Sequence, residues 1–167
     1  MVSYINNQLL NTNLKILSNE LDINIDNTIR SKLKNELEGL CNGDGYIIKD
    51  SIQLIHKTMG KVVIHDNNSY INYDITYKAK LISPSEGDII ECYVSNINKL
   101  GVILYIKLSD DDVSEDSPLI IMVPKDYFND SQYNINDINI GQKLRVIVVG
   151  VRVKYRSQKI QVIAKPE

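Results

Sequence analysis

The side chains of this 167-residue chain that suit contact with nucleic acid lie in its C-terminal half. Aromatic rings provide stacking surfaces for bases, and lysines and arginines bind backbone phosphates. Seven basic residues and no acidic ones occur between Lys143 and Lys165. The candidate RNA-binding residues are therefore Tyr93, Lys99, Tyr105, Lys107, Arg145, Arg152, Lys154, Arg156 and Lys159.

The basic residues admit a second interpretation, because lysines and arginines also keep the edge of a hairpin soluble. The formal net charge of the chain is −2, so its overall composition gives no signal for nucleic acid. Segment 109–117 carries five acidic residues and no basic one, which polarises the C-terminal half. This acidic segment lacks the glycine and the distal glutamate of a calcium loop. We interpret it as a solvated loop.

No pattern of catalytic or metal-binding residues is present. The chain has no G-x-x-x-x-G-K-[ST], G-x-S-x-G or H-E-x-x-H motif. His56 and His65 have no cysteine or second histidine at ligand spacing, and we expect them at the surface. Cys41 and Cys92 lie outside any C-x-x-C motif and are expected to be reduced. The sequence predicts no catalytic residue, no metal site and no cofactor, which makes a small nuclease the least favoured class.

The N-terminal half is predicted to hold one main helix. Ile29, Leu33 and Leu37 recur every four residues, and this apolar stripe predicts a helix over residues 27–38. We expect three local features of this helix: a cap from Asp26 or Asn27, an ion pair between Lys34 and Glu38, and a stop at Gly39.

The rest of the chain is predicted to form antiparallel strands. In the N-terminal half they are expected at 13–21, before the helix, and at 46–55, 61–66 and 69–82. Proline and glycine in segment 83–87 mark a domain boundary. Beyond it, strands are expected at 88–97, 101–108, 119–123, 143–153 and 159–165, with a helical turn at 124–128. Five strands with one helical turn after the third indicate an OB-type barrel.

The first barrel hairpin gives the expected arrangement of faces. Alternation along its first strand places Ile90, Cys92 and Val94 in the core, with Tyr93 on the outer face. Along its second strand, Ile103 and Tyr105 share one face, and Gly101 relieves crowding where the sheet coils.

At this point the sequence resembles a known family. EGDIIECYVSNINKLGVILYI resembles the opening of an S-one-type RNA-binding barrel, and GQKLRVIVVGVRVKYRSQKIQVIA resembles its last two strands. Ile103 stands where that barrel usually has a stacking phenylalanine, and IIMVPKDYF lacks the usual histidine. IRSKLKNELEGLCNGDGYIIKD, MGKVVIHD and YDITYKAKLISPSEGDII resemble the seventh-subunit family of multisubunit RNA polymerases, which includes the archaeal E-prime subunit. The matching positions are Glu38-Gly39, Gly60 and Tyr77-Lys78-Ala79.

The resemblance implies an α+β protein of two domains. Residues 1–84 would form an RNP-like tip domain with one main helix and an antiparallel sheet, and residues 85–167 the OB-type barrel. It further implies a non-catalytic stalk subunit whose tip domain docks on the polymerase core. A fourth-subunit-like partner would pack beside it, and the barrel would contact exiting RNA weakly. The docking residues would be His56, Lys57, Thr58, Met59, Gly60 and Lys61.

The alternative interpretation is a free-standing module that binds single-stranded RNA, such as a decoy or a translation-factor mimic. No secretory signal and no membrane span are evident, so an intracellular location is expected. That location is the nucleus, or the cytoplasm or virion if the isoleucine- and asparagine-rich composition reflects a large DNA virus. A protist source is also compatible with this composition.

Overall fold

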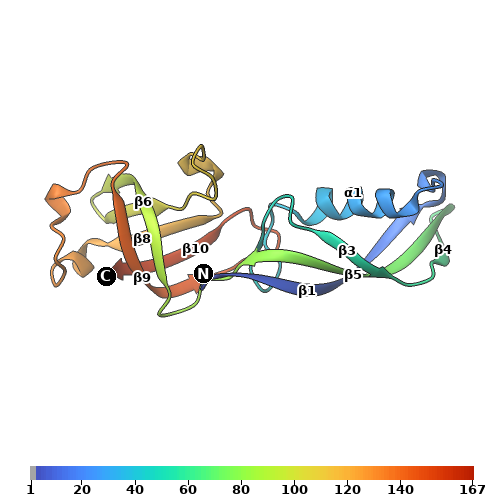
Figure 1. The fold of residues 1–167 in the computed structure, drawn as a ribbon, viewed down its shortest axis with the longest axis horizontal. Helices are drawn as coiled ribbons and strands as arrows, with labels where there is room; N and C mark the ends of the chain where they lie inside the picture. Colours follow the sequence, from blue (N-terminus) through green and yellow to red (C-terminus); the bar gives the residue numbers. More distant parts are fainter. Residues whose placement is uncertain (1–2) are drawn as a thin grey trace. The chain divides into compact units, whose positions relative to one another are not determined.

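The computed structural model describes residues 3–167, which form two compact units (Figure 1). The sheet unit comprises residues 7–39 and 47–81. The barrel unit comprises residues 3–6, 40–46 and 82–167. The units are not two uninterrupted segments, because the short segment 40–46 groups with the barrel although it lies between two parts of the sheet unit.

The elements confirm the predicted α+β class, with one α-helix and an antiparallel sheet followed by a closed five-stranded barrel. Short 3₁₀ helices occupy Ser18–Glu20, Ser114–Asp116, Lys125–Phe128 and Ile135–Asp137. The other elements are β1 (Ile5–Leu17), α1 (Ile25–Leu37), β2 (Tyr46–Ile47), β3 (Gln53–Lys57), β4 (Lys61–His65), β5 (Asn68–Ile82), β6 (Ile89–Asn98), β7 (Gly101–Tyr105), β8 (Leu119–Pro124), β9 (Lys143–Arg152) and β10 (Ile160–Pro166).

The sheet unit is built on β5, which pairs with β1 on one side and with β2, β3 and β4 on the other. Alternate residues of β5 point towards α1, which lies along one face of the sheet (Figure 1). Ile29 and Leu33 of the helix are fully buried against this face, as the apolar stripe predicts. The core of the unit consists of Leu14, Ile16, Ile29, Leu33, Ile47, Tyr73, Ile75, Tyr77, Ala79 and Leu81.

The helix begins two residues earlier than expected. Its N-cap is Asn24, whose backbone carbonyl accepts from the amides of Asn27 and Thr28, so the predicted cap at Asp26 or Asn27 is wrong. Asp26 lies in the first turn, and its carboxylate bonds the Lys57 ammonium instead. The end is as predicted: Gly39 takes a positive φ of 76°, a conformation that glycine adopts without strain.

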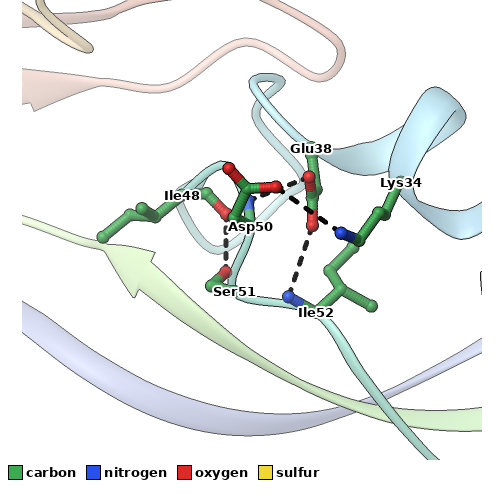
Figure 2. A network of polar contacts seen from close by, with 6 residues as sticks. All are labelled: Lys34, Glu38, Ile48, Asp50, Ser51 and Ile52. Atoms are coloured by element: carbon green, nitrogen blue, oxygen red, sulfur yellow. Dashed lines mark hydrogen bonds and ion pairs between the residues drawn. The ribbon is translucent and has the colours of Figure 1, made fainter.

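The predicted ion pair between Lys34 and Glu38 is also wrong. Figure 2 shows that the Glu38 carboxylate accepts from the backbone amides of Asp50 (2.9 Å) and Ile52 (3.4 Å). Lys34 turns to Asp50 at 3.5 Å. The Ser51 hydroxyl donates to the carbonyl of Ile48 at 2.6 Å. The carboxylate therefore anchors the 48–52 turn to the end of the helix.

The barrel closes in the order β10-β8-β7-β6-β9, with β10 and β8 parallel and the other pairs antiparallel. Its strands match the predicted ranges to within three residues, and the predicted helical turn is the 3₁₀ helix Lys125–Phe128. Ile90, Cys92 and Val94 point inward and are buried, as expected from their alternation. Ile103 points outward and is half-buried.

Both cysteines are free thiols buried in the barrel unit. Burial, assisted by the nearby Glu91 carboxylate, raises the pKa of the Cys92 thiol to about 12. A thiol is nucleophilic as the thiolate, so Cys92 is a packing residue at neutral pH.

Among residues 3–167, no helix has the length and apolar content needed to cross a bilayer.

Gly101 is required by the close approach of β7 and β8. Its φ is 154°, and a Cβ added there would lie 2.1 Å from the carbonyl oxygen of Val123. The Asn98 side-chain oxygen accepts from the amides of Leu100 and Gly101, which fixes the turn into β7. The crowding expected at this position is therefore present.

We expect Gly101→Ala to lower the free energy of unfolding by roughly 1–3 kcal/mol, since strained backbone and a backbone clash must both be relieved. Gly150→Ala, in the same barrel, is the matched control because a Cβ there meets nothing within 4 Å. Thermal unfolding of both variants measures the effect. Equal melting temperatures for the two variants would contradict it.

Candidate nucleic-acid interface and docking surface

Three side chains lie together on the outer face of the barrel: Tyr93, Tyr105 and Lys107. We call this group the tyrosine cluster. Tyr93 on β6 and Tyr105 on β7 are register partners, and their ring centroids lie 5.9 Å apart with an interplanar angle of 37°. The Lys107 ammonium lies 4.9 Å from the centroid of Tyr93. Two half-buried rings and a cation therefore lie together, and rings and cations are the groups with which single-strand-binding proteins stack bases and contact phosphates.

An ion pair borders the tyrosine cluster on its β9 side. Lys143 is the register partner of Tyr93, and its ammonium lies 2.8 Å from the Glu91 carboxylate. The hydrogen bond between them lowers the pKa of Glu91 and raises the pKa of Lys143. Glu91, Tyr93 and Lys107 also line a cleft of about 530 Å³ in the barrel unit, together with Tyr4. Tyr93 and Lys107 of the cluster thus lie on the wall of a concave surface.

The second group of predicted residues is the basic hairpin, comprising Arg152, Lys154 and Arg156 at the β9–β10 turn. All three are exposed, and residues 3–167 give none of them an ion-pair partner. The turn is anchored through its backbone, because the amide of Arg156 bonds the carbonyl of Cys41 at 2.7 Å. Arg156 has a φ of 63°, so the turn is a defined conformation that presents three free cations.

Three predicted RNA-binding residues lie outside these groups. Arg145 contacts the Glu167 carboxylate at 3.0 Å, and Lys159 donates to the carbonyl of Ser114 at 3.3 Å. Lys99 is exposed in the β6–β7 turn, six residues from Tyr93, or roughly 20 Å along an extended strand. The structure therefore does not bring the nine residues together as one site.

The acidic loop, residues 109–117, lies beside the start of β10, because the Ser114 carbonyl accepts a hydrogen bond from the Lys159 ammonium. The basic hairpin leads into this same strand. Within the loop, the Asp112 carboxylate accepts from the hydroxyl and amide of Ser109, and these hydrogen bonds lower its pKa. Asp116 accepts from the amide of Val113. These carboxylates stabilise the loop's own backbone. Residues 3–167 contain no group of three His, Cys, Asp or Glu side chains arranged to hold a metal ion.

The residues predicted to dock on a polymerase core occupy the end of β3, the connection to β4 and the first residue of β4, and residues 56–61 are here called the docking turn. His56, Met59 and Lys61 are exposed, and Met59 exposes 92% of its surface. Thr58 holds the turn to β5, since its hydroxyl accepts from the amide of Asp74 at 3.1 Å. A Cβ on Gly60 would lie 2.3 Å from the Ile71 side chain. The docking turn is therefore tightly packed at its base and apolar at its tip.

Lys57 has a structural contact that its sequence position does not reveal. Its ammonium bonds the Asp26 carboxylate at the start of α1, and this hydrogen bond lowers the pKa of Asp26. Lys57 thus links the docking turn to the helix, while the Lys61 ammonium has no hydrogen-bond or ion-pair partner within residues 3–167.

Three exposed apolar residues near the docking turn were not predicted as site residues. Ile55, Val62 and Ile64 expose 54%, 69% and 77% of their surfaces. Large exposed apolar side chains that gather on β4 and on the neighbouring end of β3 indicate an interaction surface. The sequence did contain a signal for this surface, the apolar run Val62-Val63-Ile64. An ordinary half-buried edge strand has polar residues at its solvent-facing positions, so three consecutive apolar residues indicate that some are exposed.

The chain is similar to the seventh subunit of DNA-directed RNA polymerase II from several eukaryotes. It is 30% identical over 134 residues to DNA-directed RNA polymerase II subunit rpb7 of Schizosaccharomyces pombe, covering 74% of this chain and 73% of that protein. It is 26% identical over 138 residues to the rpb7 subunit of Dictyostelium discoideum, covering 73% and 72%. The match to subunit 7 of Arabidopsis thaliana is 29% identical over 94 residues and spans 52% of that plant protein. No family model matches the chain.

We expect Lys57→Ala to increase amide hydrogen exchange across residues 56–61 and the first turn of α1, because it removes the link to Asp26. Lys61→Ala, at the other end of the docking turn, is the control and should leave exchange unchanged. The folded-state pKa of Asp26 is lowered, so the link contributes above the ordinary pKa of aspartate and is lost as the pH falls through the lowered value. The difference between Lys57→Ala and wild type should therefore disappear in acid. An equal effect of both substitutions at neutral pH would contradict this assignment.

Proposed function

Because the chain belongs to the seventh-subunit family of DNA-directed RNA polymerases, we propose that it is a non-catalytic stalk subunit of such an enzyme. In this proposal residues 1–84 dock on the polymerase core, and the barrel of residues 85–167 contacts emerging RNA. A fourth-subunit-like protein would be its stalk partner. The protein needs no cofactor for this role, and it acts in the nucleus, or in the cytoplasm or virion if the polymerase is viral.

The observation that carries the docking proposal is the exposed apolar surface of the docking turn and of β4, which forms a hairpin with β5. Met59, Val62 and Ile64 each expose more than two thirds of their surface, although the unit has a well-packed core. Burying such side chains contributes roughly 25 cal/mol for each Å² of apolar area removed from water. A partner that covers this hairpin would gain this free energy, while the bonded base of the docking turn limits the ordering that binding requires.

The RNA contact is proposed to be weak and tolerant of sequence. The tyrosine cluster offers rings to one or two bases, and the basic hairpin offers three charges to phosphates. These groups are separated, since Lys143, beside Tyr93, and Arg152 are nine positions apart along β9, or up to roughly 30 Å. Weak contact suffices for a subunit held beside an RNA exit path, because tethering raises the effective concentration of the RNA.

The alternative function is a free-standing module that binds single-stranded RNA. The tyrosine cluster would serve either function, but the exposed hairpin of the sheet unit favours the stalk subunit. A free-standing module needs appreciable RNA affinity by itself, whereas a stalk subunit needs stable association with the polymerase.

We expect Ile64→Asp to reduce co-purification of the large polymerase subunits with the tagged chain by roughly tenfold or more, since a charge would be buried in the interface. Ile23→Asp is the matched control, because Ile23 is a fully exposed isoleucine of the same unit outside the hairpin. Mass spectrometry of chains captured from native lysate gives the readout. The docking proposal fails if Ile64→Asp captures as much polymerase as wild type, and the stalk assignment fails if wild type captures none.

We expect two distinct effects on binding of labelled single-stranded RNA by the isolated chain. Replacing Arg152, Lys154 and Arg156 by alanine should reduce the salt dependence of log K by up to about 2, at about 0.7 for each lost phosphate contact. Tyr93→Ala should weaken binding with little change in that slope, because stacking releases no counterions. Tyr127→Ala, an exposed tyrosine outside the cluster, is the control. Unchanged affinity and slope in all variants would exclude both barrel contacts.

A further inference from the structure

The sheet unit contains a second group of unpaired cations, away from the docking turn. A cleft of about 410 Å³ opens over residues of β1, β3, β5 and the 48–52 turn. Three exposed lysines line it: Lys49, Lys78 and Lys80. Within residues 3–167 none of their ammonium groups has a hydrogen-bond or ion-pair partner. We call this surface the lysine cleft.

The positions of two of these lysines are set by β5. Tyr77, Ala79 and Leu81 point into the core, so Lys78 and Lys80 must point to the opposite face. Their Cα atoms are separated by roughly 6.8 Å, two residues of an antiparallel strand. Two charges in a row on a rigid strand match a ligand whose own charges repeat along a chain.

The third lysine comes from the turn drawn in Figure 2. Lys49 lies between Ile48, whose amide bonds the carbonyl of Lys80 at 3.0 Å, and Asp50, whose amide bonds the Glu38 carboxylate. The amide of Lys80 also bonds the Ser51 hydroxyl at 3.2 Å. The backbone that carries Lys49 is therefore fixed to the strand that carries Lys78 and Lys80.

The electrostatics of the cleft favour an anion. Its one carboxylate is that of Asp50, which faces the Lys34 ammonium at 3.5 Å, so the three lysines are not neutralised from within. Asn7 and Gln53 add side-chain amides, which donate to phosphate or sugar oxygens and also pair with base edges. Lysines act as point charges without the fixed geometry of arginine, so the cleft suits a repeated anion and not one specific group.

We propose that the lysine cleft binds backbone phosphates of a single-stranded nucleic acid. This site is separate from the barrel contacts and from the docking turn, and it gives the sheet unit a binding activity besides polymerase docking. The cleft has no aromatic ring and no glycine-rich loop, so it differs from a mononucleotide site. The repeated phosphodiester, flanked by amide groups, is the ligand that its charges and donors fit.

The experiment measures binding of labelled single-stranded RNA and DNA to the full chain at two salt concentrations. The background variant carries Arg152, Lys154 and Arg156 changed to alanine, so the barrel charges are absent. Adding Lys49→Ala, Lys78→Ala and Lys80→Ala should weaken binding roughly fivefold or more and lower the salt slope by up to about 2. The matched control removes the same charge with Lys15→Ala, Lys125→Ala and Lys165→Ala, three exposed lysines outside the proposed sites, and should leave affinity nearly unchanged.

A second readout locates the contact directly. RNA containing 4-thiouridine should cross-link to peptides that carry residues 47–53 and 76–82 in wild type and lose these cross-links in the cleft variant. Circular dichroism confirms that each variant is folded. Equal weakening by the two triple substitutions, absence of these cross-links, or equal competition by polyglutamate would overturn the proposal. Tighter binding of RNA or of DNA shows which of these two nucleic acids the cleft accepts. Because polymerase is absent from the assay, its outcome is independent of the docking test.

Discussion

The strict alternation of side chains along β5 is the constraint on which the sheet unit depends. Every other strand of that sheet pairs with β5, and its inward residues form the surface against which α1 packs. A shift of one residue in register would turn Tyr77 outward and bury Lys78 without a partner. The same register that stabilises the core therefore places the docking turn and β4 at one part of β5 and the lysine cleft at another.

The extent of regular structure could be predicted wherever apolar periodicity determines it, and its local details could not. The barrel strands and the body of α1 follow directly from alternating or fourfold-spaced aliphatic residues. β1 was expected from residue 13 but begins at Ile5. The sequence did not predict its first part because the outward asparagines have low strand propensity. In the structure, distant partners hold two of them. Asn13 bonds Asp74, and Asn11 bonds Thr76. Such bonds join residues more than 60 positions apart, which no local pattern reveals.

The same limit applies to the candidate sites. Charge and residue type identified cations in the barrel, but they could not show which cations are already paired. Arg145 is occupied by Glu167 and Lys159 by a backbone carbonyl, whereas Arg152 is free. Pairing depends on three-dimensional contacts with segments far away in sequence. The pairing of Tyr93 with Tyr105 has the same limit, because it depends on a bulge between Val94 and Asn96 of β6. Without this bulge, the register that starts at Asn98 and Gly101 would place Tyr105 opposite Val94.

The charge distribution of the barrel also explains how a chain with net charge −2 can offer a local phosphate surface. The acidic loop lies next to the basic hairpin through the contact of Lys159 with Ser114. Seen from a distance, the acidic and basic groups offset each other, and salt screens what remains beyond about 8–10 Å, so long-range attraction of RNA is weak. A phosphate in direct contact with an exposed arginine is much closer than this distance, so salt weakens that contact less. In the proposed function, such a surface would contact RNA that is already held nearby and would not collect it from solution.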